Sequence, residues 1–188
     1  MIRYVLPVIF PLALAPAALA QHHHMSSHAP QSGGHAPSPQ TPYAGFEKRS
    51  IKALSDQQIE DLKQGRGIGL ALAAELNGYP GPSHVLELAV QLELSPEQKR
   101  RMEELYTAMK TESVELGVRL IDQEMVLDQH FSERRITADL LGEITTAIGI
   151  TQAKLRNAHL KYHLLAVDVL RPEQVKKYNM LRGYTPTQ

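Results

Sequence analysis

The stretch that decides the fold is residues 94–137, which read LSPEQKRRMEELYTAMKTESVELGVRLIDQEMVLDQHFSERRIT. Ser95 suits the N-cap of a helix, Pro96 suits the first helical position, and Gln98 completes a capping box. Apolar side chains then recur at a spacing of three and four residues. These signals predict one long helix that runs from Pro96 to about His130.

A short turn at residues 131–135 and a start signal at Thr137 predict a second long helix, which reaches about Val167. Because the connection is short, the two long helices should pair as an antiparallel hairpin. No segment from Tyr43 onward alternates apolar and polar residues with the period of a strand, so the predicted fold class is all-α. Shorter flanking helices, the third of them capped by Ser83, are expected over residues 55–65, 70–76, 83–92 and 171–183.

The first long helix carries apolar side chains on two opposite sides. One stripe should pack on the second long helix, and it consists of Met102, Leu105, Tyr106, Met109, Leu116, Leu120 and Leu127. The opposite side holds a candidate partner surface, which consists of Val114, Val118, Ile121 and Met125. A hairpin alone would leave this surface in water, so the N-terminal helices, a second subunit in a dimeric cradle, or bound clients must cover it.

Composition excludes several classes of function. The 188-residue chain has 20 basic and 20 acidic residues, so its formal net charge is zero, which argues against a nucleic-acid-binding protein. It has no cysteine, which excludes disulfides, thiolate metal sites and a thiol nucleophile. Gly65-Arg-Gly-Ile-Gly69 lacks the preceding strand and the ending of a phosphate-binding loop, and no serine-nucleophile motif is present. We therefore predict a protein that is not an enzyme and needs no cofactor.

Residues 1–20 have the layout of a secretory signal peptide. Arg3 supplies the positive charge, residues 4–14 are largely apolar, and the segment ends in Ala-Leu-Ala. This apolar core is too short to span a membrane. Cleavage after Ala20 would make Gln21 the first residue and leave no membrane span, so we expect a periplasmic protein.

Residues 21–42 are rich in Pro, Ser, Gly and His and almost free of aliphatic residues, so we expect a disordered lead. Imidazole is a good ligand for Cu, Ni and Zn, and the thioether of Met25 suits Cu(I). The alternative is a solvated linker whose enrichment in histidine is incidental. The candidate metal ligands in the lead are His22, His23, His24 and His28.

Two similar boxes open the first long helix and the last short helix: Leu94-Ser-Pro-Glu-Gln98 and Leu170-Arg-Pro-Glu-Gln174. With the signal peptide and the long hairpin, they resemble the paired LTxxQ motifs of the Spy/CpxP family over roughly residues 84–184. The resemblance implies an exported all-helical chaperone-like or envelope-stress protein, often a cradle-shaped antiparallel dimer. It also implies a relation to periplasmic heavy-metal sensors, in which His, Glu and Met side chains bind the metal. The motif residues are Leu94, Pro96, Gln98, Leu170, Pro172 and Gln174.

A second candidate metal site lies on the second long helix. His159 and His163 are four residues apart, which is the spacing of a two-histidine half-site. If the hairpin turns about Arg134, this pair lies near Glu104 and Met109, and the four side chains would suit Cu, Ni or Co. The alternative is that both histidines make ordinary contacts at the border of the apolar stripe.

The first hypothesis for function is a periplasmic, non-enzymatic helical protein that binds unfolded polypeptides or modulates an envelope sensor, as a homodimer. The alternative is a heavy-metal sensor or buffer for Cu, Ni or Zn. The expected organisation is a signal peptide, the lead, short N-terminal helices over residues 43–82, a Spy/CpxP-like helical domain over residues 83–184, and a tail over residues 185–188.

Overall fold

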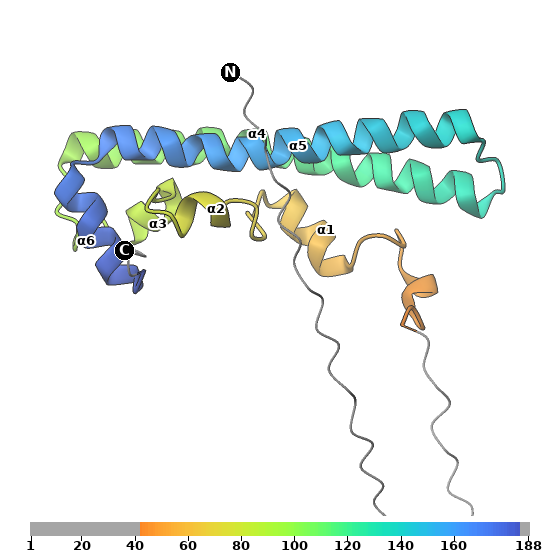
Figure 1. Cartoon of the computed structure of the whole chain (residues 1–188), viewed down its shortest axis with the longest axis horizontal. Helices are drawn as coiled ribbons and strands as arrows, with labels where there is room; N and C mark the ends of the chain where they lie inside the picture. The colour runs from red at the N-terminus through yellow and green to blue at the C-terminus, as the bar shows by residue number, and fades with distance from the viewer. Residues whose placement is uncertain (1–41, 185–188) are drawn as a thin grey trace, which may run out of the picture. The chain divides into compact units, whose positions relative to one another are not determined.

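The computed structural model describes residues 42–184, and this part of the chain is helical with no β-strand, which confirms the all-α prediction (Figure 1). The predictions for the signal peptide and for the histidines of the lead lie outside the described residues. The elements are a short 3-10 helix η1 (Phe46–Lys48), α1 (Asp56–Lys63), α2 (Leu72–Glu75), α3 (Pro82–Glu87), α4 (Pro96–Ser132), α5 (Ala138–Val169) and α6 (Pro172–Arg182).

The long hairpin is built from α4 and α5, as predicted. The hydroxyl of Ser95 accepts the Gln98 backbone N–H at 3.1 Å, and the Gln98 side chain accepts the Ser95 N–H at 3.1 Å, so the capping box is complete. Thr137 caps α5 by accepting the Leu140 N–H at 3.3 Å. Between the helices, Arg134 adopts a positive φ of 54°, which lets the chain reverse within a few residues.

Side-chain hydrogen bonds join the two long helices at more than one level of the hairpin. Glu112 of α4 accepts a hydrogen bond from the Lys161 ammonium at 2.8 Å and another from the Tyr162 hydroxyl at 3.3 Å, both on α5. Nearer the open end, the Gln98 side-chain amide donates to the carbonyl of Val169 at 2.9 Å, so the bonds between the two helices centre on residues 133–137.

The short helices lie on one side of the hairpin (Figure 1). The end of α1 rests directly on α4 at Gly117, where a Cβ would collide with the carbonyl oxygen of Leu62. This approach closes the first hydrophobic cluster, which joins the N-terminal segment to both long helices. Its buried members are Ile51, Leu54, Leu62, Leu116, Leu120, Ile121, Ile148, Leu155 and Ala158.

The N-terminal segment covers part of the candidate partner surface. Ile121 is only 8% exposed and belongs to the first cluster, so its assignment to a partner surface was wrong. Val114 is half-buried and packs closely on Gly65. If Gly65 carried a β-carbon, that atom would lie only 3.1 Å from Cγ2 of Val114. Val118 and Met125 remain 42% and 49% exposed.

The second hydrophobic cluster lies where α3 and α6 meet the other end of the hairpin. Its buried members are Val85, Leu92, Met102, Leu105, Met109, Tyr162, Ala166, Leu170 and Tyr178. The third helix differs from its prediction, because Gly81 is its N-cap rather than Ser83 and it ends at Glu87 rather than Leu92. Pro82 occupies its first position, which its fixed φ favours. Among residues 42–184, no helix combines the length and the apolar character needed to cross a bilayer.

Candidate functional site

The two boxes of the sequence meet in space. The Gln98 side-chain amide donates to the side-chain oxygen of Gln174 at 2.8 Å, and the Gln174 amide contacts the Gln98 side-chain oxygen at 3.2 Å. Pro96 and Pro172 occupy the first turns of α4 and α6. Leu170 is buried in the second cluster and Leu94 packs against it. All six motif residues therefore lie at one junction.

Each motif glutamine also holds the chain that enters the other box. The Gln98 amide donates to the carbonyl of Val169 at 2.9 Å, and the Gln174 amide donates to the carbonyl of Leu92 at 3.0 Å. The Gln174 side chain also accepts the backbone N–H of Arg171 at 2.9 Å. Gln174 is only 2% exposed, so these partners satisfy its buried polar atoms. The boxes thus fix the start of α4 against the joint between α5 and α6.

The predicted four-residue metal set is not assembled. Glu104 is an exposed residue of α4 that forms ion pairs with Arg100 and with Arg101, the latter at 3.1 Å. His163 of α5 instead donates its Nδ1 proton to the carbonyl of Tyr79 at 2.6 Å. Within residues 42–184, no cluster of three or more His or acidic side chains is placed to hold a metal ion.

A buried polar network surrounds Glu75, a residue that the sequence analysis missed. Its carboxylate accepts hydrogen bonds from the Tyr178 hydroxyl and from the Gly81 N–H, the latter at 3.2 Å, and it lies 3.7 Å from His163 and 3.8 Å from Arg182. Burial, reinforced by the Glu75 carboxylate, raises the pKa of Tyr178 well above its ordinary value. The network joins α2, α5 and α6, and nothing in the local sequence distinguishes Glu75 from a surface acid.

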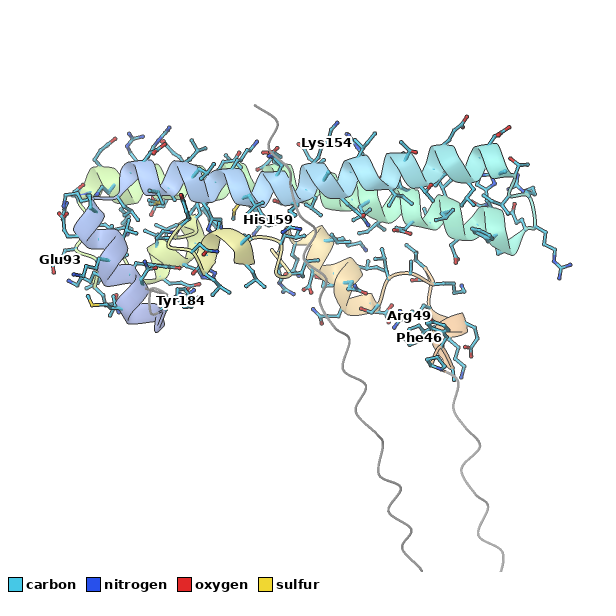
Figure 2. The ribbon with its side chains drawn as sticks, viewed as in Figure 1. Phe46, Arg49, Glu93, Lys154, His159 and Tyr184 are labelled. Carbon is cyan, nitrogen blue, oxygen red and sulfur yellow. The ribbon has the colours of Figure 1, made fainter. Side chains whose placement is uncertain are left out.

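His159 and Met109 do lie beside the same cavity, of about 250 Å³. His159 is only 3% exposed, and its Nε2 has no hydrogen-bond partner among the described residues. Burial lowers the pKa of His159, and the neighbouring His163 lowers it further. Figure 2 shows His159 on the side of α5 that faces the short helices, whereas Lys154 points away from them.

Two of the larger grooves along the hairpin are lined by residues of both long helices. An apolar groove of about 550 Å³ lies at the border between the N-terminal segment and the two long helices, and we call it the leucine groove. Its walls are Leu54, Gln58, Leu62, Ile68, Leu70, Leu120, Gly149, Gln152, Ala153, Leu155 and Arg156. A second groove, of about 670 Å³, is charged, and we call it the charged groove. Its walls are Glu112, Glu115, Leu116, Arg119, Ile150, Ala153, Lys154 and Asn157.

Compared with models of known families, with curated proteins and with solved structures, the chain matches none.

Proposed function

We propose that this chain is an exported, non-enzymatic helical protein that binds partly unfolded polypeptides, as a chaperone or a modulator of envelope stress. The observation that carries the proposal is the leucine groove, an apolar channel that stays open although the short helices pack on the hairpin. Open apolar surface rimmed by polar side chains is characteristic of sites for apolar protein segments.

Ile68 is the most informative residue of this groove. It is 49% exposed, and it has a positive φ of 36°, which β-branched residues seldom adopt. Gly67 and Gly69 flank it in a loop whose Leu70 N–H bonds the carbonyl of Gly67 at 2.7 Å. The fold thus holds an apolar side chain at the groove at a conformational cost, which favours a binding role for it.

The rim of the groove suits weak and reversible binding. Gln58, Gln152 and Arg156 offer hydrogen bonds and one positive charge beside the leucine side chains. Burial of apolar area supplies binding free energy of about 25 cal/mol per Å² without requiring a particular sequence. A client segment that folds withdraws its apolar side chains and leaves the groove.

We propose that Val118 and Met125 face a second copy of the chain, since they remain exposed after the short helices have packed. Light scattering coupled to size exclusion should then give a dimer, and a monomer at all concentrations would contradict this part of the proposal. Export predicts that secreted material begins at Gln21, which intact-mass measurement checks.

Aggregation of a chemically unfolded client, followed by light scattering, tests the proposal. The mature protein at near-stoichiometric amounts should suppress aggregation without metal. Ile68→Asn should weaken suppression, since Asn accepts a positive φ but removes the apolar side chain. The matched control is Ile150→Asn, because Ile150 is 52% exposed and lines the charged groove. Equal activity of the two variants, or no suppression by the parent protein, would contradict the proposal.

The alternative is a heavy-metal sensor or buffer. It rests on the histidines of the lead, namely His22, His23, His24 and His28. This alternative is tested by repeating the aggregation experiment with Cu, Ni or Zn added to the protein and by measuring metal binding in parallel. Tight metal binding without any suppression of aggregation would favour this alternative.

A further inference from the structure

The short helix α2 leaves two leucine side chains largely in solvent. Its buried residues are Ala74 and Glu75, whereas Leu72 and Leu76 are 55% and 57% exposed. The Leu76 N–H bonds the Leu72 carbonyl at 3.0 Å, so the two side chains lie on the same face of one helical turn. Figure 1 shows no other helix of the described residues on the side of α2 that faces away from the hairpin. We call Leu72 and Leu76 the α2 patch.

The α2 patch continues the leucine groove. Gly69 links the two surfaces, because a β-carbon on Gly69 would lie 3.5 Å from Cδ1 of Leu72. The Leu72 side chain therefore folds back over the residue next to Ile68, which lines the groove and is itself half exposed. A bound chain that leaves the groove past Ile68 would meet Leu72 and then Leu76.

The charge of this segment favours an apolar partner without charge. Residues 67–82 read GIGLALAAELNGYPGP and contain one charged residue, Glu75, which is only 6% exposed. A surface for anionic membranes combines its apolar side chains with Lys and Arg, and this segment has neither. The α2 patch therefore matches uncharged, apolar side chains of a polypeptide.

The α2 patch is too small for a stable contact with a second copy of the chain. A specific, stable interface buries about 800 Å² on each partner and uses about 20–30 residues a side. The patch and Ile68 together present only three apolar side chains. A second cluster of a client that is already bound needs no such area, because binding in the groove raises its local concentration at the patch.

We propose that the α2 patch is a second subsite for clients, so that the chain binds polypeptides with two neighbouring apolar clusters. This inference rests on the proposed function, because the first cluster occupies the leucine groove. Leu76 follows Ile68 by eight positions, which span about 12 Å at the rise of a helix. An extended client covers that distance in about four residues. The chain would thus select unfolded segments whose two apolar clusters lie about four residues apart.

Fluorescence anisotropy of two labelled peptides tests the proposal. One peptide carries a single apolar cluster in an uncharged Gly/Ser sequence, and the other carries a second cluster about four residues further on. The two-cluster peptide should bind the parent protein about tenfold more tightly, the effect of partly burying about one further leucine side chain. Equal affinity of the two peptides would overturn this inference and leave the proposed function intact, whereas binding of neither peptide would contradict both.

The variant Leu76→Gln removes an apolar side chain from the patch and keeps a residue that suits a helix. It should weaken binding of the two-cluster peptide about tenfold and leave binding of the one-cluster peptide unchanged. The matched control is Val90→Gln, since Val90 is 87% exposed and lies in the connection between α3 and α4, outside both surfaces. This control should bind both peptides as the parent does.

Three results with these variants would overturn the proposal. Equal weakening by Leu76→Gln and Val90→Gln would show that the effect is not specific to the patch. Dissociation of a dimer by Leu76→Gln, with unchanged peptide affinity, would assign the patch to a second copy of the chain. Loss of binding to phosphatidylglycerol vesicles, again with unchanged peptide affinity, would assign it to a membrane surface.

Discussion

The side chains of Gln98 and Gln174 bond to each other at 2.8 Å although 76 residues separate them in the sequence. Each residue also completes the first turn of its own helix by accepting a backbone N–H. The two boxes that the sequence repeats are therefore two halves of one junction. This junction fixes the open end of the hairpin, from which α3 and α6 extend.

Replacing Gln174 should destabilise the fold strongly. Gln174→Ala leaves the carbonyl of Leu92 and the N–H of Arg171 without their partners, so we expect a loss of about 2–3 kcal/mol in the free energy of unfolding. Urea unfolding followed by circular dichroism measures it. Gln129→Ala is the control, since Gln129 is an exposed helix residue that bonds only its neighbour Glu133 by its side chain. Similar losses in both variants would show that the junction contributes little.

The contact between α1 and α4 requires Gly117. A Cβ there would meet the Leu62 backbone, which cannot move aside as a flexible side chain could, so Gly117→Ala should cost about 1–3 kcal/mol. Gly149→Ala is the matched change on α5, where nothing lies within 4 Å of the added Cβ. That variant should gain about 0.5–1 kcal/mol from helix propensity. Thermal unfolding of both variants checks the opposite signs, and destabilisation by both would contradict this packing.

The network around Glu75 should depend on the hydroxyl of Tyr178. Tyr178→Phe keeps the ring in the second cluster but removes a hydrogen bond to a buried carboxylate, which should cost about 1–3 kcal/mol. Tyr79→Phe serves as the control, because the ring of Tyr79 is exposed and His163 bonds its backbone carbonyl. Denaturant unfolding measures the free energy of unfolding of both variants. Tyr178→Phe should lose more of it than Tyr79→Phe, and equal values would contradict a stabilising role of the network.

Acidification should destabilise the fold through His159. Its pKa in the folded protein lies below the ordinary value of 6.5, chiefly because burial disfavours the imidazolium. The unfolded chain therefore binds more protons, so stability is full above about pH 6.5 and falls as the pH drops towards the folded pKa. Each unit between the two pKa values is worth about 1.4 kcal/mol. His159→Leu should flatten the dependence of unfolding free energy on pH in this window, and an unchanged slope would contradict the assignment.

Local signals predicted the secondary structure well. The capping box at Ser95 and the cap at Thr137 are formed as expected, because a cap depends only on residues three or four positions apart. The positive φ of Gly183 likewise ends α6 where the sequence indicated. The exception is α3, which starts after Gly81 and ends at Glu87 although its local signals placed it over residues 83–92.

Long-range contacts were harder to predict. The predicted set of Glu104 and His163 did not form, because Glu104 pairs with its helix neighbours Arg100 and Arg101, and His163 bonds the backbone of Tyr79. The bond between Glu75 and Tyr178 joins residues 103 positions apart, and no periodic pattern encodes it. The burial of Ile121 follows from the close approach at Gly117, which composition does not reveal.

The most direct test of client binding is residue-level NMR of the isotopically labelled protein titrated with a soluble, permanently unfolded polypeptide. If the leucine groove binds clients, saturable shifts should appear at Ile68, Leu70 and Gln152, with little change at Ile150 and Lys154 of the charged groove. Shifts confined to the charged groove, or none at saturating polypeptide, would contradict the proposed function.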